Sequence, residues 1–336
     1  IVIYYSTILA WAWVYLWHSL TLAWGTDPEG FFVEQVLQRA DSPGEIGAPL
    51  WYLVVGMVLT WGAIYLILRK GVRSVGKVVM FTVPLPLVLL VLLAIRGLTL
   101  PGAIDGIAYY LTPDFSKLLE PSIWLRAYGQ IFFSLSLASG VMIAYGSYLG
   151  RRAEIVNSAL ITGLANCGTS FFAGFTVFSM LGYLAQVQGM SVPEVTTSGT
   201  GLAFVAYPTA ITQLPALSTL FGLVFFVTLL FLGIPTGKLA AGFIAVAFPI
   251  SLFFTTRGGF YWFDIVDKWV CDFGLVVAGL VQCIVIGWLY DIRGFRSYLN
   301  ETSEVHLGVW WEWMLRYLTP AVLVVMLVLN LRAELL

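Results

Sequence analysis

Long apolar stretches recur along the chain and alternate with shorter polar segments. A helix needs about 20 apolar residues to cross the hydrocarbon core of a bilayer, and we find about nine candidate stretches. They cover approximately residues 1–23, 47–69, 75–97, 122–149, 153–186, 214–234, 238–255, 264–290 and 309–331. The pattern therefore predicts an all-α integral membrane protein.

The intervals 24–46, 98–121 and 187–213 have a different composition. They are rich in Gly, Pro, Asp and Thr, which is typical of loops. We expect two of these loops to contain short helices that lie at the membrane interface.

Charged residues between the stretches indicate an orientation. Cytoplasmic loops carry an excess of Lys and Arg, and basic residues follow the second, fourth and eighth stretches, whereas the opposite loops are acidic. The basic residues are Arg69, Lys70, Arg73, Lys77, Arg151, Arg152, Arg293 and Arg296. We therefore expect the chain to begin on the cytoplasmic side and to end outside.

The composition excludes several classes of protein. Only 10% of the 336 residues are charged and 60% are hydrophobic, whereas a soluble domain carries about 25% charged residues. The net charge of −1 argues against a nucleic-acid platform. Two distant histidines, and three cysteines that we expect to be buried as small apolar residues, argue against a metal site. No acid/base cluster is present, so we do not expect an enzyme.

The first residue is Ile1, inside an apolar stretch and without a charged start. We expect the sequence to be a fragment of a longer protein.

The fourth stretch places polar groups at mid-membrane depth. Residues 134–140 read SLSLASG, with three hydroxyls and one glycine. One interpretation is a discontinuous helix whose free carbonyls and helix ends bind an ion and a small anionic group. The other is close helix packing, because small residues and serine are common at membrane helix interfaces. Taken alone, this stretch favours packing.

The fifth stretch carries Asn166 and Ser170, which are four residues apart and lie on one face of a helix. Amide and hydroxyl oxygens suit a hard cation, whereas a hydroxyl and the amide of Gln130 can donate to a halide. Hydrogen bonding between helices is the alternative, and the spacing does not decide between them.

Acidic residues in the eighth stretch are also candidates, because intramembrane acids are usually functional. Asp264 and Asp267 are expected to begin this span, where a carboxylate favours a helix N-terminus. Asp272 lies more than one turn deeper.

Several segments, in this order, resemble the neurotransmitter:sodium symporter family, particularly its bacterial leucine-transporter-like amino-acid symporters. They include IVIYYSTILAWAW (1–13), YLTPDF (110–115), GQIFFSLSL (129–137), ANCGTSFFAGF (165–175) and FTTRGGFYWFDIVDKW (254–269). The resemblance covers nearly the whole chain and corresponds to family helices 3 to 11.

The resemblance implies an inverted-repeat, broken-helix transporter fold. Residues 1–336 would form a single transmembrane domain. Residues 1–97 would be the remainder of the first repeat, 122–290 the second repeat and 309–331 an extra C-terminal helix. The implied function is sodium-coupled symport of an amino acid or related small amine by alternating access, in the cell (inner) membrane.

The resemblance also implies a substrate site. Tyr5 would hold the substrate carboxylate, Ile1 would line an apolar part of the pocket and Phe133 would form an aromatic lid. The remaining substrate residues would be Ser134, Ser136 and Ser139, on the unwound part of a broken helix.

The same correspondence implies ion sites and gates. Ser134 and Asn166 would bind sodium, and Thr236 would be the remnant of a second sodium site. Chloride-independent members often have a carboxylate at the Ser170 position, so neutral Ser170 predicts chloride stimulation. The chloride ligands would be Gln130, Ser134 and Ser170, and the gates would be Phe133, Tyr148 and Asp267.

The chain departs from the family pattern in several places. Helices 1 and 2 are missing, and helix 8 is short, with residues 235–238 leading directly into the next helix. Ala138 replaces a usual glycine. Because the missing helices normally supply half of each ion shell, we expect this 336-residue chain to be incompetent for transport without them.

Two alternatives remain open. A proton-coupled amino-acid transporter on the same scaffold could use Asp272 as its titrating acid, and a degenerate homologue would not transport. The expected partners are a small amino-acid substrate and the lipid bilayer, with no nucleic acid. A homodimer is left open.

Overall fold

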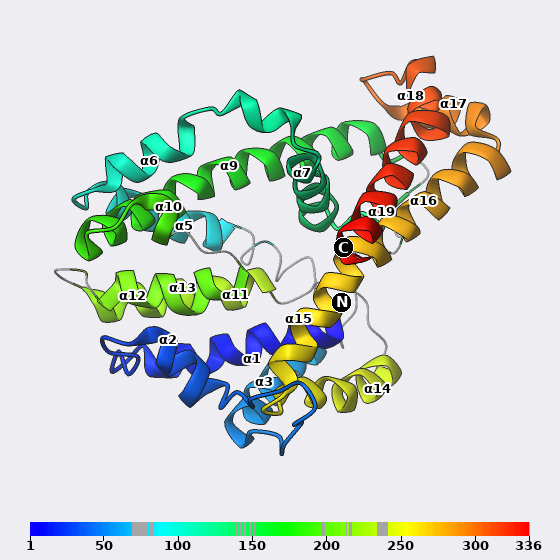
Figure 1. Cartoon of the computed structure of the whole chain (residues 1–336). Helices are drawn as coiled ribbons and strands as arrows, with labels where there is room; N and C mark the ends of the chain where they lie inside the picture. Colours follow the sequence, from blue (N-terminus) through cyan, green and yellow to red (C-terminus); the bar gives the residue numbers. More distant parts are fainter. Residues whose placement is uncertain are drawn as a thin grey trace. The chain divides into compact units, whose positions relative to one another are not determined.

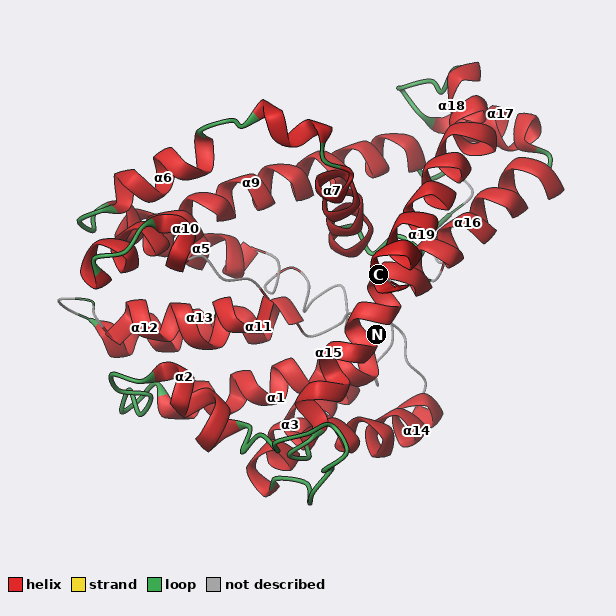
Figure 2. Ribbon diagram, in the orientation of Figure 1, coloured by secondary structure: helices red, strands yellow, loops and turns green. Residues whose placement is uncertain are grey.

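The computed structural model describes residues 1–68, 80, 84–138, 140, 143, 146–147, 149–150, 152–195, 199–212, 214, 217–233 and 241–335. These residues form helices joined by loops and turns (Figure 1, Figure 2). Among them, the extended backbone pairs only in an isolated antiparallel bridge between Pro49 and Thr256. The described part of the chain is therefore helical, as the apolar pattern predicts.

The chain divides into two compact units. The first contains Ile1–Thr112 and Phe171–Ile265, and the second contains Pro113–Ser170 and Val266–Leu336. Two helices, α9 (Ile155–Gln188) and α15 (Gly259–Trp269), contribute residues to both units. The expected repeat boundaries at residues 97, 122 and 290 remain predictions.

The first unit consists of apolar helices joined by loops that contain short helical turns. Helix α1 contacts α3, α13 and α14 in this unit. Its elements, besides parts of α9 and α15, are α1 (Val2–His18), α2 (Pro28–Gly30), η1 (Phe31–Val36), α3 (Trp51–Leu68), α5 (Pro84–Leu98), α6 (Ala103–Leu111), α10 (Val192–Val195), α11 (Gly199–Gly201), η3 (Leu202–Ala206), α12 (Tyr207–Thr212), α13 (Ser218–Gly233), α14 (Ala241–Ser251) and η4 (Leu252–Thr255).

Helices α1 and α3 approach closely because Gly56 has no side chain. A Cβ atom at Gly56 would lie 2.8 Å from the carbonyl oxygen of Ala10. The close approach buries Met57 and Trp61 of α3 together with Ala247 of α14. Small residues at such crossings are typical of packing between membrane helices.

The second unit contains the other long helices. Helices α16 and α19 lie side by side in it (Figure 1). Its elements, besides parts of α9 and α15, are η2 (Phe115–Leu119), α7 (Pro121–Ser134), η5 (Val270–Gly274), α16 (Leu275–Ile284), η6 (Val285–Leu289), α17 (Ile292–Thr302), α18 (Val309–Trp313), η7 (Met314–Leu318) and α19 (Thr319–Leu335).

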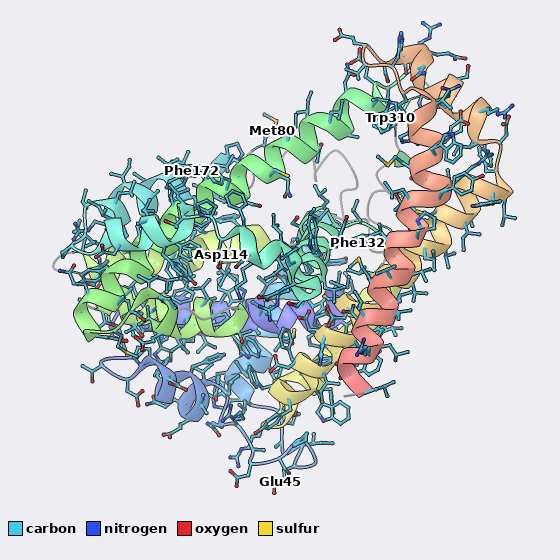
Figure 3. All side chains as sticks on the ribbon, turned by 45° about the horizontal axis from the view of Figure 1, so that its top comes forward. Glu45, Met80, Asp114, Phe132, Phe172 and Trp310 are labelled. Atoms are coloured by element: carbon cyan, nitrogen blue, oxygen red, sulfur yellow. The ribbon has the colours of Figure 1, made fainter. Side chains whose placement is uncertain are left out.

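The core of the second unit joins α7 to α16 and α19. Phe132 of α7 is buried with Leu275 and Val276 of α16 and with Leu323 and Met326 of α19. Figure 3 labels Phe132. This contact holds the C-terminal part of α7, which carries several candidate site residues.

Two polar contacts join later elements of the second unit. Arg296 of α17 pairs with the buried carboxylate of Glu312 in α18, with an Nε–Oε1 distance of 2.9 Å. Arg316 of η7 donates to the carbonyl oxygen of Gly287 in η6 at 2.6 Å. The first contact joins two successive helices, and the second joins η7 back to η6 across them.

Three described helical segments are long and apolar enough to cross a membrane: Ile155–Gln188, Gly259–Leu289 and Val309–Arg332. A fourth span is obtained if Pro84–Leu98 and Ala103–Leu119, bent by 113° at their junction, count as one broken span. Shorter apolar helices cover Trp51–Leu66, Leu202–Thr212, Ser218–Phe231 and Ile244–Thr255. The count of nine spans therefore remains a prediction.

Two local expectations are corrected. Helix α15 begins at Gly259, so Asp264 and Asp267 lie beyond its first turn and do not begin the span. The preceding loop is held by the hydrogen bond from Gly258 N to Ile46 O, at 3.1 Å, and the helix begins at the next residue. The second expectation was that all three cysteines are buried. Cys283 is buried, but Cys271 is half-buried and Cys167 is exposed.

Candidate functional site

Helix α7 ends at Ser134, in the middle of the predicted fourth span. Two backbone hydrogen bonds close this end: Ser136 N donates to Phe133 O at 3.0 Å and Leu137 N donates to Phe132 O at 2.9 Å. This pair of bonds, with a left-handed residue at Ser136, is a Schellman motif. The first hydroxyls of the 134–140 segment therefore lie at a helix end.

The backbone after α7 adopts unusual conformations. Ser136, Ala138 and Gly140 have φ angles of +51°, +59° and +80°. The left-handed region costs a residue with a side chain about 1–2 kcal/mol, so Ser136 and Ala138 are strained. The segment is thus unwound, as the discontinuous-helix interpretation of the fourth stretch requires.

A hydrogen bond links this helix end to α9. The side-chain amide of Asn166 donates through Nδ2 to Oγ of Ser134 at 3.1 Å. Both residues belong to the second unit, and both are half-buried. An amide and a hydroxyl from two different helices therefore meet at one point.

The expected chloride ligands lie on the same two helices. Gln130 is one helical turn before Ser134, and Ser170 is one turn after Asn166, so each pair shares a helix face. Gln130 and Ser170 are both exposed. Phe133, the expected lid, is 37% exposed and lies next to Ser134 in sequence.

The other expected residues are distributed as follows. Ile1 and Tyr5 belong to the first unit, one helical turn apart, with Tyr5 N donating to Ile1 O at 3.0 Å. Asp267 lies on α15, where its Oδ1 is 3.6 Å from Sγ of Cys271. Ser136 lies in the unwound segment. Ser139, Tyr148 and Thr236 lie outside the described residues.

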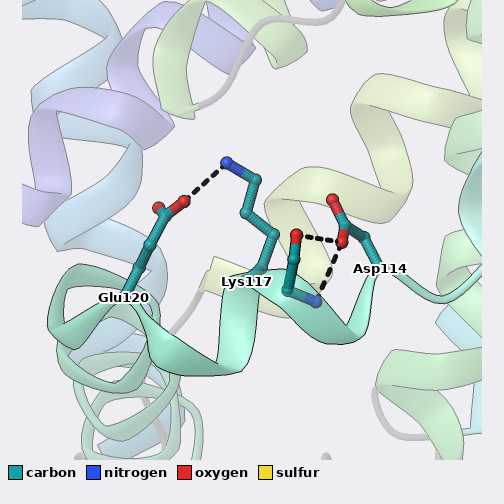
Figure 4. A network of polar contacts seen from close by, with 4 residues as sticks. Asp114, Lys117 and Glu120 are labelled. Atoms are coloured by element: carbon teal, nitrogen blue, oxygen red, sulfur yellow. Dashed lines mark hydrogen bonds and ion pairs between the residues drawn. The ribbon is translucent and has the colours of Figure 1, made fainter.

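The start of α7 is also fixed by polar contacts (Figure 4). Oδ1 of Asp114 accepts a hydrogen bond from Ser116 N at 3.0 Å, and Nζ of Lys117 contacts Oε1 of Glu120 at 2.7 Å. The indole of Trp124 donates to Leu118 O at 2.8 Å. These contacts hold the turn η2 at the N-terminus of α7.

Sequence reasoning missed the Schellman motif and the role of Phe132. Phe132 supplies a carbonyl to the motif and a buried ring to the core. A sequence signal for this helix end was the occurrence of small residues at every second position, 136, 138 and 140. Serine and alanine rarely take the left-handed conformation, so the signal was weak.

The groups around Ser134 suit a small cation. The negative end of the α7 dipole lies at its C-terminus, which favours positive charge. Hydroxyl and amide oxygens are neutral hard donors of the kind that alkali and alkaline-earth cations prefer. Because Asn166 donates through Nδ2, the other atom of its amide, Oδ1, is the one suited to a cation.

Comparison with known proteins identifies the chain. The profile of the sodium:neurotransmitter symporter family matches residues 25–242 and 236–334. The chain belongs to this family. The family resemblance deduced from the sequence motifs is therefore confirmed, and the chain is a member of a transporter family rather than a family of enzymes.

Individual members of the symporter family are similar along most of the chain. An uncharacterized sodium-dependent transporter of Methanocaldococcus jannaschii is 36% identical over 97% of the chain. A sodium- and chloride-dependent taurine transporter of Bos taurus is 35% identical over 91% of it. The sodium- and chloride-dependent creatine transporter 1 of Homo sapiens is 36% identical over 89% of it.

The chain covers 71% of the archaeal relative but only 54% and 51% of the taurine and creatine transporters. It thus spans about half the length of these mammalian symporters. Together, the family and the apolar helices indicate a multi-pass membrane protein.

Proposed function

We propose that the intact protein is a sodium-coupled symporter of an amino acid or related small amine that works by alternating access in the cell membrane. The observation that carries this proposal is the contact between Ser134 and Asn166, 3.1 Å apart at the end of α7. It is supported by the sodium dependence named for the relatives. The proposal makes the protein a transporter and not an enzyme.

In this proposal, Ser134 and Asn166 are ligands of one sodium ion. The ion would bind Oγ of Ser134 and Oδ1 of Asn166, with further oxygens from the unwound backbone. The adjacent C-terminus of α7 would lower the free energy of the bound cation through its dipole. Thr236 would belong to a second sodium site.

We also propose that chloride stimulates transport. A site that gathers sodium and a substrate carboxylate gains from a nearby negative charge, and Ser170 is neutral. A chloride ion held by Gln130, Ser134 and Ser170 would supply that charge. The named chloride dependence of the taurine and creatine transporters supports this proposal.

The substrate would be a zwitterion of amino-acid type. Tyr5 would bind its carboxylate, Ile1 would contact its apolar part, and Phe133 would close over it. Ser136 and Ser139 would line the floor of the pocket. Asp267 would act in the outer gate and Tyr148 in the inner gate.

The test is uptake of radiolabelled amino acids into proteoliposomes that contain the intact protein. Uptake that requires an inward sodium gradient supports the proposal. Uptake that is driven by a pH gradient without sodium would instead support proton coupling. Failure of any amino acid to bind would support a non-transporting homologue.

A further inference from the structure

The first unit contains a second polar site, which is made of residues other than the proposed ion ligands. A cavity of about 270 Å³ lies between the loop after η1 and the loop before α15. Its wall includes four charged residues, two of each sign. We call this cavity the loop pocket, and its lining residues are Gln38, Arg39, Ala40, Asp41, Glu45, Gly47 and Arg257. Figure 3 labels Glu45, one of its acidic residues.

Hydrogen bonds between the two loops give the loop pocket a defined shape. Ala40 N donates to Arg257 O at 3.2 Å, and Gly258 N donates to Ile46 O at 3.1 Å. Two side chains at the start of α15 complete the connection. The hydroxyl of Tyr261 donates to Ala40 O at 3.1 Å, and the indole of Trp262 donates to Pro43 O at 3.0 Å. The pocket walls are therefore preformed.

Both arginine side chains of the loop pocket are positioned. Nη2 of Arg257 donates to Oε1 of Gln38 at 3.3 Å. The aliphatic part of Arg257 covers Gly47, where an added Cβ would lie 3.3 Å from its carbons. The guanidinium carbon of Arg39 lies 5.7 Å from the ring centre of Tyr261, a cation–π contact. Ordering the arginines in advance lowers the entropy cost of binding.

The acidic residues of the loop pocket are exposed. Asp41 and Glu45 both face solvent. Within the part of the chain that the structure describes, the ion pairs involve other residues, and neither acid pairs with Arg39 or Arg257. The pocket thus presents two cationic and two anionic groups that have not neutralised each other.

We infer that the loop pocket binds a small zwitterion of amino-acid type. Guanidinium groups form strong, often bidentate hydrogen bonds with carboxylates, so the anionic end would contact Arg39 and Arg257. The cationic end would contact Asp41 and Glu45. The two acids would repel an isolated anion, and the two arginines would repel an isolated cation. A molecule that carries both charges therefore fits best.

The size of the loop pocket agrees with this ligand. Pockets for drug-sized molecules measure about 300–1,000 Å³, and the loop pocket lies just below that range. The acidic loops are expected on the outer side, so the pocket would hold substrate before it enters the transport site. The ligand class rests on the proposed function, whereas binding at the loop pocket can be measured separately.

The experiment measures binding of L-alanine to the 336-residue chain in detergent by saturation-transfer NMR. The buffer contains potassium and no sodium, so that the sodium-dependent transport site does not contribute. We expect saturable binding that R257Q and the double variant D41N/E45Q each weaken by at least about tenfold, as the loss of charge-assisted hydrogen bonds predicts. E29Q, which removes an exposed carboxylate from the short helix α2 outside the pocket, should leave affinity unchanged.

Acetate and methylammonium, which each carry one charge, should bind more weakly than L-alanine. Equal binding of either ion, unchanged affinity in both pocket variants, or an equal loss in E29Q would overturn the inference. If R257Q does not fold, D41N/E45Q decides alone, because within the described residues the hydrogen bonds that hold the two loops together do not involve the Asp41 or Glu45 carboxylate. Variants of the proposed transport site could lose sodium-driven uptake without any change in L-alanine binding at the loop pocket. A failure of one proposal can therefore be told apart from a failure of the other.

Discussion

Asn166 donates a hydrogen bond to Oγ of Ser134 across 3.1 Å, which joins the middle of α9 to the last residue of α7. A contact between two polar side chains in adjacent apolar helices can stabilise packing, bind an ion, or do both. The left-handed backbone at Ser136 and Ala138 favours the second role, because packing alone does not require two strained residues.

The strain after α7 predicts an unusual effect of glycine. A138G should stabilise the protein by about 1 kcal/mol, because glycine takes the left-handed conformation without the cost paid by alanine. The measurement is the free energy of unfolding in detergent. A127G, which places glycine within α7, should instead destabilise the protein by about 0.5–1 kcal/mol. Equal effects of the two substitutions would contradict this account of residue 138.

The close approach of α1 and α3 predicts a contrast between two glycines of α3. G56A should destabilise the protein by about 1–3 kcal/mol, because the new Cβ meets the Ala10 backbone and the helices must separate. G62A should be neutral or stabilising, because no atom lies within 4 Å of the added Cβ. Unfolding measurements on the two variants test this packing, and an unaffected G56A would show it to be wrong.

The pair formed by Arg296 and buried Glu312 predicts a large loss when one partner is removed. R296M should cost about 3 kcal/mol, because it leaves a buried carboxylate without its partner. The double variant R296M/E312L should recover much of that loss. K117M, which breaks an exposed pair with Glu120, should cost less than about 1 kcal/mol. A small effect of R296M would mean that Glu312 is solvated.

Parts of this structure could be read from the sequence. The stretch 153–186 corresponds closely to α9 at Ile155–Gln188, because a long apolar run has few other ways to satisfy its backbone. The pairing of Ser134 with Asn166 was anticipated only through the family motifs. The break after α7 was implied by the family resemblance, whereas the stretch taken alone favoured packing, because the break depends on a left-handed serine that helix propensity does not favour. The start of α15 at Gly259 was not predicted, because it follows a residue that is bonded to a loop more than 200 positions earlier, and a local pattern does not reveal such a contact.

The proposed charge balance predicts that an acid can replace chloride. S170E should make sodium-driven uptake independent of chloride, because the carboxylate supplies the negative charge beside the sodium site. Uptake by the intact protein is compared in chloride and gluconate buffers. S158E, on the same helix and remote from the site in sequence, should keep its chloride response. A chloride response that persists in S170E would contradict the assignment of the anion site.

The most direct test is the sodium dependence of uptake by the intact protein in proteoliposomes. N166A and S134A should each raise the sodium concentration needed for half-maximal uptake by at least about tenfold, as the loss of one ion–dipole contact predicts. S158A removes a hydroxyl that donates to the carbonyl oxygen of Glu154, just before the start of α9, and should leave that concentration unchanged. If N166A and S134A retain the original sodium dependence while remaining folded, these two residues hold helices together and do not bind sodium.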